Sequence, residues 1–235
     1  PAERRRFMDM ELSQLDKIYL SNLINYNKVV NQRNKLLKEL SFKSSEEKLE
    51  TLDIWDLQLV KYGTEVMKRR VGFVQELNEI IGGLHEKLSG GTEKLTIEYQ
   101  PCVEETTFLD TVTKMRERDL RMKSTCFGPH KDDLIFFING SEVKKYGSQG
   151  QQRTAALSLK LAEIELVKKV VKDTPVLLLD DVLSELDSSR QNQLLDAIQD
   201  IQTMITCTGL EDFVNHRFHI DKIFKVEEGK VTSQN

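Results

Sequence analysis

The chain has 235 residues, of which 39% are hydrophobic, enough for a real core in one large domain or two small ones. The net charge of −4 and the pI of about 5.7 show that the chain as a whole is acidic, whereas proteins that bind nucleic acid are usually basic. Any contact with nucleic acid must therefore come from local basic clusters. No apolar segment approaches the length of a membrane span, and the chain begins at Pro1 without a Met, so we expect a fragment of a longer soluble protein.

The chain opens with a helical pattern. Apolar residues recur at helical spacing over residues 12–40, although Asp16 and Arg33 interrupt the pattern. A capping box formed by Ser44 and Glu47 predicts the start of a second helix. We therefore expect two helices joined by a short polar turn.

The second helix carries an apolar stripe at strict intervals of seven residues, and the glycine pairs at 82–83 and 90–91 predict its end. The stripe consists of Leu52, Leu59, Val66, Phe73 and Ile80. Two long helices joined by a short turn form an antiparallel hairpin, so the first part of the chain is expected to be a helical arm. A helical bundle domain is the alternative.

Shorter elements follow the arm. Alternating apolar residues predict a strand at residues 94–99, and a helix is expected at 107–123. A second strand, 134–138, leads through the hairpin turn Asn139-Gly140 to residues 143–146. The polar turn before this strand is interpreted as structural, and contact of His130 and Lys131 with nucleotide or DNA is the alternative.

A first phosphate-handling element is the sequence YGSQGQQRT, where a long helical pattern begins. Ser148 is placed as the N-cap of that helix. The start of a helix exposes unpaired N–H groups and the positive end of the helix dipole, and Gly150 allows close approach of a polyphosphate. The segment is therefore predicted to bind an anion, with a serine-capped core helix as the alternative.

A second element is VLLLDD, a short apolar run that reads as a strand buried on both faces and ends in Asp180 and Asp181. Carboxylates at this edge of an open α/β sheet face the ligand crevice. Asp180 suits Mg²⁺, and Asp181 can orient the attacking water. An acidic turn at the end of a strand is the alternative.

The sequence SELD then opens the next helix as a cap-like turn, and a strand is expected at residues 203–206. A last pair of strands is expected near residues 218–220 and 222–226. Each phosphate-handling motif recurs by chance when taken alone, but the three in this order indicate half of an α/β nucleotide-binding head.

In this order, YGSQGQQRT, VLLLDD and SELD resemble the signature loop, Walker B strand and D-loop of ABC-type ATPases. The blocks FGPHKDDLIFFINGSEVKKYGSQGQQRT and PAERRRFMDMELSQLD are similar to those of the RecF family, in the SMC-like branch of DNA-repair ATPases. The resemblance covers most of the chain and is highly specific over residues 127–189. It implies an α/β fold in which residues 93–235 are the C-terminal part of an ABC-type P-loop ATPase head. Residues 1–92 would be the short helical arm that corresponds to the SMC coiled coil.

The resemblance also implies ATP and Mg²⁺ as cofactors and an ATP-dependent homodimer. One subunit would present its signature to the ATP of the other, while Asp180 would hold Mg²⁺ and Asp181 would activate water in its own subunit. The signature residues are Ser148, Gln149, Gly150 and Gln151, the D-loop residues are Ser184 and Asp187, and Thr208 stands near the switch position. Two of these depart from the common ABC pattern, which has Glu in place of Asp181 and His near Thr208.

The sequence G-x-x-x-x-G-K-[ST], which would hold the β- and γ-phosphates, does not occur in the 235 residues. In the resembled family this loop lies upstream, before the helical arm. We therefore expect a slow ATPase in the parent protein and no ATP turnover by this chain alone.

The resemblance further implies a task in recombinational DNA repair, DNA replication and the SOS response. The protein would bind DNA at single-strand gaps or junctions and help load RecA with RecR and RecO. It would work in the bacterial cytoplasm at the nucleoid, without a membrane partner. The alternative is a non-catalytic module that binds a repair partner through arm and head without ATP turnover.

Clusters of basic residues are the candidates for DNA contact. Three residues at spacing i, i+4 and i+7 would share one face of the helix expected at 107–123; they are Lys114, Arg118 and Arg121. The other clusters are Arg4-Arg5-Arg6, Lys68-Arg69-Arg70 and Lys144-Lys145. A solvated surface is the alternative for each cluster.

Overall fold

The computed structural model describes residues 1–42, 45–208 and 220–234. It contains two compact units, residues 1–173 and residues 174–235, and each is described by itself. The contacts thus divide at residue 173 and not at residue 92. The assignment of residues 1–92 to an arm and 93–235 to a head stays a prediction about domain function.

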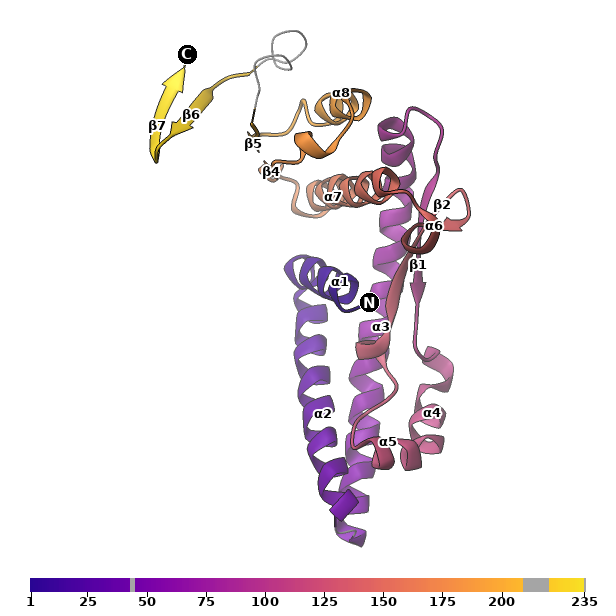
Figure 1. The fold of residues 1–235 in the computed structure, drawn as a ribbon. Helices are drawn as coiled ribbons and strands as arrows, with labels where there is room; N and C mark the ends of the chain where they lie inside the picture. Colours follow the sequence, from indigo (N-terminus) through magenta and orange to yellow (C-terminus); the bar gives the residue numbers. More distant parts are fainter. Residues whose placement is uncertain (43–44, 209–219, 235) are drawn as a thin grey trace. The chain divides into compact units, whose positions relative to one another are not determined.

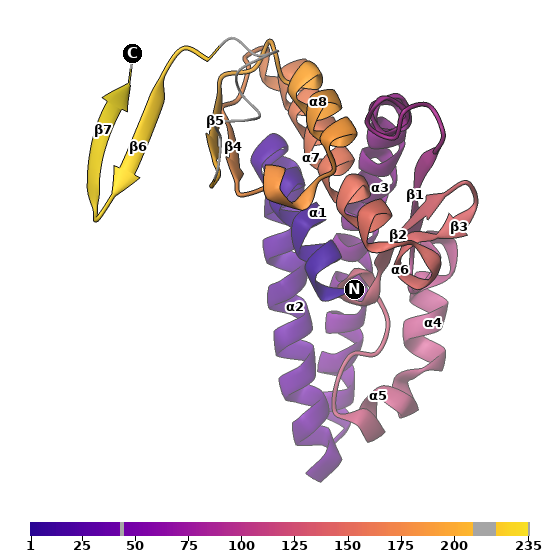
Figure 2. The same ribbon diagram turned by 45° about the horizontal axis from the view of Figure 1, so that its top comes forward.

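The first unit begins with three helices, α1 (Ala2–Leu15), α2 (Lys17–Phe42) and α3 (Glu46–Leu88). Figures 1 and 2 show α2 and α3 side by side as a long hairpin. The prediction of one helix over residues 12–40 is wrong at Asp16, where the backbone is extended (φ −138°). The Asp16 carboxylate accepts the N–H groups of Ile18 and Tyr19 (2.9 and 3.0 Å) and so starts a new helix.

The ends of α3 differ from those expected. The N-cap is Ser45, whose hydroxyl accepts the N–H of Lys48 (3.4 Å), while Ser44 of the expected capping box lies outside the described residues. The helix continues through the glycine pair at 82–83, because His85 and Leu88 beyond it are buried in the core. Only the pair at 90–91 follows the helix end, with φ of 68° and 81°.

The stripe of apolar residues on α3 is buried, as its spacing predicts. Its first four members are fully buried, and only the fifth, Ile80, is half-buried. Ile81 replaces Ile80 in the core, since an α-helix has 3.6 residues per turn and drifts against a repeat of seven. From Leu59 onward, α3 therefore packs into the main core of the unit, whereas Leu52 belongs to a separate cluster with Leu36, Leu37 and Leu40 of α2.

Arg33, which interrupts the apolar pattern of α2, is fully buried. Its Nε donates to Asp56 of α3 (2.6 Å), and its Nη1 donates to Asp119 (2.6 Å) and to the hydroxyl of Thr125 (3.0 Å). A buried charge requires such partners. Arg33 thus joins both helices of the hairpin to the segment that follows the first strand.

The first sheet is antiparallel with the order β1 (Leu95–Gln100), β2 (Asp133–Ile138), β3 (Ser141–Glu142). Both strands expected here are confirmed, and Asn139 and Gly140 form the predicted turn with φ of 50° and 79°. The strand after the turn is short, however, because residues 143–146 form a helical turn, α6 (Val143–Tyr146).

The helix expected at 107–123 is two helices, α4 (Phe108–Lys114) and α5 (Arg116–Met122), which follow the 3₁₀ turn η1 (Glu105–Thr107). The break is at Met115, where the backbone departs from helical values (φ −95°, ψ 8°). A further 3₁₀ turn, η2 (Pro129–Lys131), precedes β2. The unit ends with α7 (Gln149–Val171), which packs on α3 and α1 (Figure 2).

In the second unit, β4 (Leu177–Asp180) pairs in parallel with β5 (Thr203–Thr206), both as predicted. The 3₁₀ turn η3 (Leu183–Glu185) and α8 (Ser188–Ala197) connect them. The expectation that the VLLL strand is buried on both faces is wrong for this chain, since Leu178 is 69% exposed. Within the described residues, β4 has β5 as its one strand neighbour.

The last two strands are β6 (Ile223–Glu227) and β7 (Lys230–Gln234), an antiparallel hairpin. The strand expected near residues 218–220 falls largely outside the described residues, and the strand expected at 222–226 is confirmed with a one-residue shift. The turn of the hairpin is at Glu228 and Gly229, both with positive φ.

Candidate nucleotide and nucleic-acid sites

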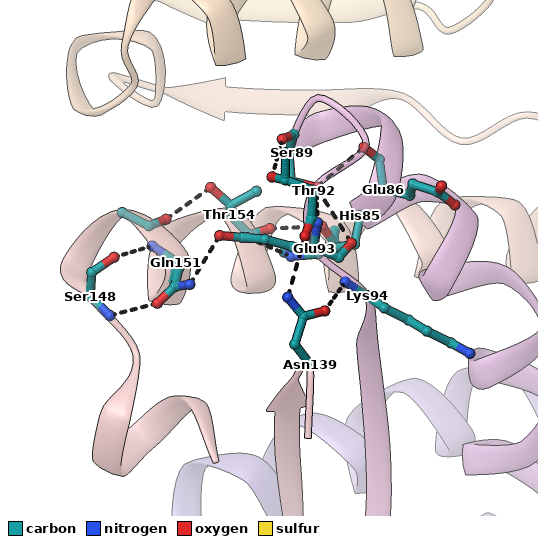
Figure 3. Close-up of polar contacts among 12 residues, drawn as sticks. His85, Glu86, Ser89, Thr92, Glu93, Lys94, Asn139, Ser148, Gln151 and Thr154 are labelled. Carbon is teal, nitrogen blue, oxygen red and sulfur yellow. Dashed lines mark hydrogen bonds and ion pairs between the residues drawn. The ribbon is translucent and has the colours of Figure 1, made fainter. Parts of the chain in front are cut away.

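The signature segment forms a capped helix start, as predicted (Figure 3). The Ser148 hydroxyl accepts the N–H of Gln151 (3.2 Å), and the Gln151 side chain accepts the N–H of Ser148 (2.9 Å). Gly147 is required in front of the cap, because a Cβ there would lie 2.5 Å from the carbonyl oxygen of Val143. The chain thus turns tightly from α6 into α7.

This arrangement leaves three donors at the start of α7. The hydroxyl of Ser148 accepts from Gln151 and keeps its own hydrogen, and the N–H groups of Gln149 and Gly150 have no carbonyl within the helix. Ser148 and Gln149 are exposed, and α7 is 23 residues long. Donors at the positive end of a long helix suit a phosphate oxygen.

The side chain of Gln151 is used within the chain. Its amide oxygen binds Ser148, and its amide nitrogen donates to Glu93 (3.0 Å), in the segment between α3 and β1 (Figure 3). Direct contact of Gln151 with ATP stays a prediction, whereas its observed contacts hold the loop in place.

The two Walker B aspartates lie at the end of β4, beside Thr206 of β5. Asp180 accepts a hydrogen bond from the Thr206 hydroxyl (2.5 Å). The N–H of Asp181 donates to the carbonyl and the hydroxyl oxygens of Thr206 (3.1 Å each). Asp181 has a φ of 52°, a conformation that is uncommon for residues other than glycine and that is frequent near functional sites.

Thr206 was missed by the sequence analysis, which pointed to Thr208 as the residue near the switch position. Thr208 is exposed, two residues beyond the end of β5. The two strands pair in parallel, and their register places Thr206 directly beside Asp180. This strand pairing is the observation that identifies Thr206 as a residue of the site. Between Thr206 and Thr208, Cys207 has a raised pKa because of its burial and the negative charge of Asp181.

The D-loop residues shape the connection to α8. The Ser184 hydroxyl donates to the carbonyl oxygen of Asp181 (2.8 Å). Asp187 is the N-cap of α8, where its carboxylate accepts the N–H of Arg190 (3.0 Å) and pairs with the Arg190 guanidinium. The hydrogen bond from the Arg190 N–H and the nearby guanidinium charge lower the pKa of Asp187. Both residues therefore stabilise the turn that follows the aspartates.

The three residues Lys114, Arg118 and Arg121 do not share one helical face, so that prediction is wrong. Lys114 is the last residue of α4, and Arg118 and Arg121 belong to α5 beyond the break at Met115. The Arg118 guanidinium lies over the ring of Phe127, 5.5 Å from its centroid.

Most other basic clusters are engaged in ion pairs within the chain. Arg4 binds Asp133 (2.6 Å), and Arg69 binds Asp16 and Glu76 (3.1 Å each). These ion pairs give Arg4 and Arg69 a structural role, while contact of the two clusters with DNA stays a prediction.

Arg70 of α3 is buried in the centre of the unit. Its guanidinium donates to Asp9 of α1 (2.7 Å), to Asp132 (3.2 Å) and to the carbonyl oxygen of Pro129 (2.7 Å). Arg70 is 1% exposed, so this residue of the second cluster has no surface to offer to DNA.

Lys144 and Lys145 on α6 are exposed and close in sequence to the signature. Lys145 pairs with Glu142 (2.6 Å), which raises the pKa of Lys145. These two lysines remain candidates for phosphate contact.

His130 has a structural role, in agreement with the interpretation of its turn. Its Nε2 donates to the carbonyl oxygen of Thr125 (3.0 Å), so its Nδ1 accepts from the hydroxyl of Tyr26 (2.6 Å). Burial lowers the pKa of His130 to about 4, which keeps the ring neutral at pH 7.

Comparison with solved structures identifies the class of protein. The chain superposes on a structure of the recombination mediator protein RecF-ATP in the RecFOR pathway with a TM-score of 0.86 and 36% identity, covering 100% of this chain and 63% of that one. A Pyrococcus furiosus Smc head domain has a TM-score of 0.51 and 16% identity over 100% of this chain and 57% of that one, which shows a shared fold. The fold is thus that of an SMC-like, ABC-type ATPase head with a helical arm.

Curated relatives identify the family. The DNA replication and repair protein RecF of Lachnospira eligens is 64% identical over 235 residues, which are 100% of this chain and 65% of the relative. The protein of the same name from Clostridium perfringens is 41% identical, over 98% of this chain and 64% of the relative. No family model matches the sequence. The chain belongs to the RecF family, and it spans just under two thirds of the length of these relatives.

Among the described residues, no helix combines the length and apolar character needed to cross a membrane.

Proposed function

We propose that the protein is a DNA-binding recombination mediator that forms a dimer on binding ATP. The observation that carries this proposal is the start of α7, where Ser148, Gln149 and Gly150 offer donors to solvent at the positive end of a long helix. In a full-length RecF protein that carries this sequence, these donors would act on ATP held by the other subunit, as the resemblance to ABC-type ATPases implies.

In its own subunit, the chain would contribute the residues at the end of β4. Asp180 would hold Mg²⁺ through the carboxylate oxygen that Thr206 leaves free, which fits a cation that takes one or two carboxylates and completes its shell with water and phosphate. Asp181 would orient the attacking water, and the exposed Thr208 would sense the γ-phosphate. Bound ATP would supply the phosphate charge that joins the subunits. Ser184 and Asp187 would fix the D-loop.

The task in DNA repair is proposed from the relatives. Their names place them in DNA replication and repair, and the RecF-ATP structure belongs to the RecFOR pathway. We propose that this protein binds gapped or junction DNA and helps load RecA with RecR and RecO, in the bacterial cytoplasm at the nucleoid. Exposed Lys144 and Lys145 are proposed to contact DNA phosphates, together with the exposed residues Lys114, Arg118 and Arg121.

ATP hydrolysis is proposed for a full-length RecF protein that carries this sequence, at a slow rate. The 235-residue chain alone should show negligible turnover, because a phosphate site without the Walker lysine lacks its main γ-phosphate contacts. Turnover of Mg²⁺-ATP by this chain that disappears in Asp181→Asn would contradict this expectation.

The decisive experiment replaces the signature serine in a full-length RecF protein that carries this sequence. Ser148→Arg should remain monomeric with ATP in analytical ultracentrifugation, because the bulky cation fills the position offered to the γ-phosphate. Ser141→Arg, at an exposed serine of β3, is the matched control and should dimerise normally. A normal ATP-dependent dimer in Ser148→Arg would refute the proposal and favour a module that binds partners without using ATP.

A further inference from the structure

The signature loop is connected to the end of α3 by a chain of polar contacts (Figure 3). The amide nitrogen of Gln151 donates to Oε1 of Glu93 (3.0 Å), and Oε2 of Glu93 lies 3.1 Å from Nε2 of His85. Nδ1 of His85 lies 2.9 Å from the hydroxyl of Ser158 on α7. That hydroxyl donates to the carbonyl oxygen of Thr154, one turn earlier in the same helix (2.8 Å). The contacts therefore run from the exposed loop into the core between α3 and α7.

The polarity of these contacts fixes the orientation of the Gln151 amide. An ionised carboxylate only accepts hydrogen bonds, so both neighbours of Glu93 must donate to it. The NH₂ group of Gln151 therefore faces Oε1, and the Nε2–H group of His85 faces Oε2. The amide oxygen of Gln151 is thereby directed to the N–H of Ser148. A rotated amide would place an oxygen against the carboxylate and an NH₂ group against an N–H.

The anchor of this arrangement lies in the core of the unit. His85 is fully buried and belongs to α3, whereas Glu93 is partly buried in the segment that follows the helix. The exposed loop at Ser148 would otherwise order its side chains at an entropic cost when it meets a ligand. A donor must be held near its productive position to stabilise a phosphate, because small displacements weaken hydrogen bonds steeply.

The geometry points to Glu93, held by His85, as a positioning residue that keeps Ser148 and the start of α7 in place for the γ-phosphate of ATP on a second subunit. The inference rests on the proposed function and adds to it a pair of residues outside every motif of the ATPase. It also connects the end of the long arm helix α3 to the signature by direct contacts.

A charge exchange between positions 93 and 151 tests this role in a full-length RecF protein that carries this sequence. Gln151→Glu keeps the capping box, since a glutamate at that position also accepts the Ser148 N–H, but places its carboxylate against Glu93. The double variant Glu93→Gln/Gln151→Glu restores a donor facing an acceptor and still offers a carbonyl oxygen to His85. Glu86→Gln, at an exposed residue of α3, is the matched control.

The dissociation constant of the ATP-dependent dimer is measured by sedimentation, and the midpoint of thermal unfolding is measured for each variant. Gln151→Glu and Glu93→Gln should each weaken the dimer by about tenfold or more, the size of one charge-assisted hydrogen bond. The double variant should return to within about threefold of the unmodified protein. Glu86→Gln should not change the dimer.

The outcomes separate this inference from the proposed function. If Ser148→Arg dimerises normally with ATP, both are overturned. If Ser148→Arg abolishes the dimer but the variants at positions 93 and 151 match Glu86→Gln, the positioning role is overturned and the proposed function stands. The positioning role is also overturned if the double variant Glu93→Gln/Gln151→Glu does not restore the dimer. It is likewise overturned if the loss of dimer affinity in each variant is explained by its lower unfolding midpoint.

Discussion

Replacement of Arg33 by methionine should destabilise the first unit strongly. The variant keeps the approximate length and volume of the side chain but removes its hydrogen bonds to Asp56, Asp119 and Thr125. The two carboxylates are only 3% and 2% exposed, so water cannot replace the guanidinium without opening the packing of α2 on α3 and α5.

The size of the effect follows from what each carboxylate retains. Removal of one partner from a buried ion pair costs about 3–5 kcal/mol. Asp56 keeps a bond from Arg116 (2.6 Å), and Asp119 keeps a bond from the N–H of Cys126 (3.0 Å). We therefore expect a loss of about 3 kcal/mol in unfolding free energy, and a fall of about 10 °C in the unfolding midpoint for a chain of this size.

The assay is urea unfolding of the 235-residue chain followed by far-UV circular dichroism. Lys35→Met, at an exposed position of α2, is the control and should change stability by less than about 0.5 kcal/mol. The triple variant Arg33→Met/Asp56→Asn/Asp119→Asn should recover part of the loss, since it leaves no buried charge without a partner at this site. The reasoning is refuted if Arg33→Met is as stable as Lys35→Met.

Three further predictions concern pH, packing and DNA. The pKa of Glu11 is raised from 4.5 to about 7, chiefly by burial and then by the hydrogen bond and charge of Glu163. The folded state therefore holds this proton more tightly than the unfolded state does. As a result, the free energy of unfolding falls as pH rises from about 4.5 to about 7. Glu11→Gln should therefore gain about 3 kcal/mol over the unmodified chain between these limits in urea unfolding, and a pH-independent difference would contradict this. Gly128→Ala should lower the free energy of unfolding by about 2–4 kcal/mol in the same assay, because φ is 129° and a Cβ would lie 2.3 Å from the Tyr26 hydroxyl oxygen. Gly83→Ala is the control, since a Cβ there would meet open space, and it should not destabilise the chain. Alanine at Lys114, Arg118 and Arg121 in a full-length RecF protein should weaken binding alike across DNA sequences. The slope of log affinity against log salt should fall by roughly 0.9 for each duplex phosphate that is no longer neutralised, and an unchanged slope would assign these residues to solvent.

The sequence by itself determined the features that depend on neighbours along the chain. The seven-residue stripe of α3, the alternation of β1, the turn at Asn139 and Gly140 and the cap at Ser148 each lie within a few residues, so local spacing and backbone preference are enough to predict them. The order of the three motifs, read with the blocks around them, also sufficed to indicate the RecF family.

The tertiary structure alone decided which polar residues meet. Arg33 and Asp119 are 86 residues apart in sequence, and Gln151 and Glu93 are 58 apart. No periodicity links such positions, so the sequence could present Arg33 only as an interruption of a helix and Gln151 only as part of a motif. The break at Met115 is likewise a feature of the folded unit, since the spacing of the basic residues around it would also suit one continuous helix. Burial selects these partners, because a charge or amide removed from water must find its hydrogen bonds wherever the fold brings a complementary group.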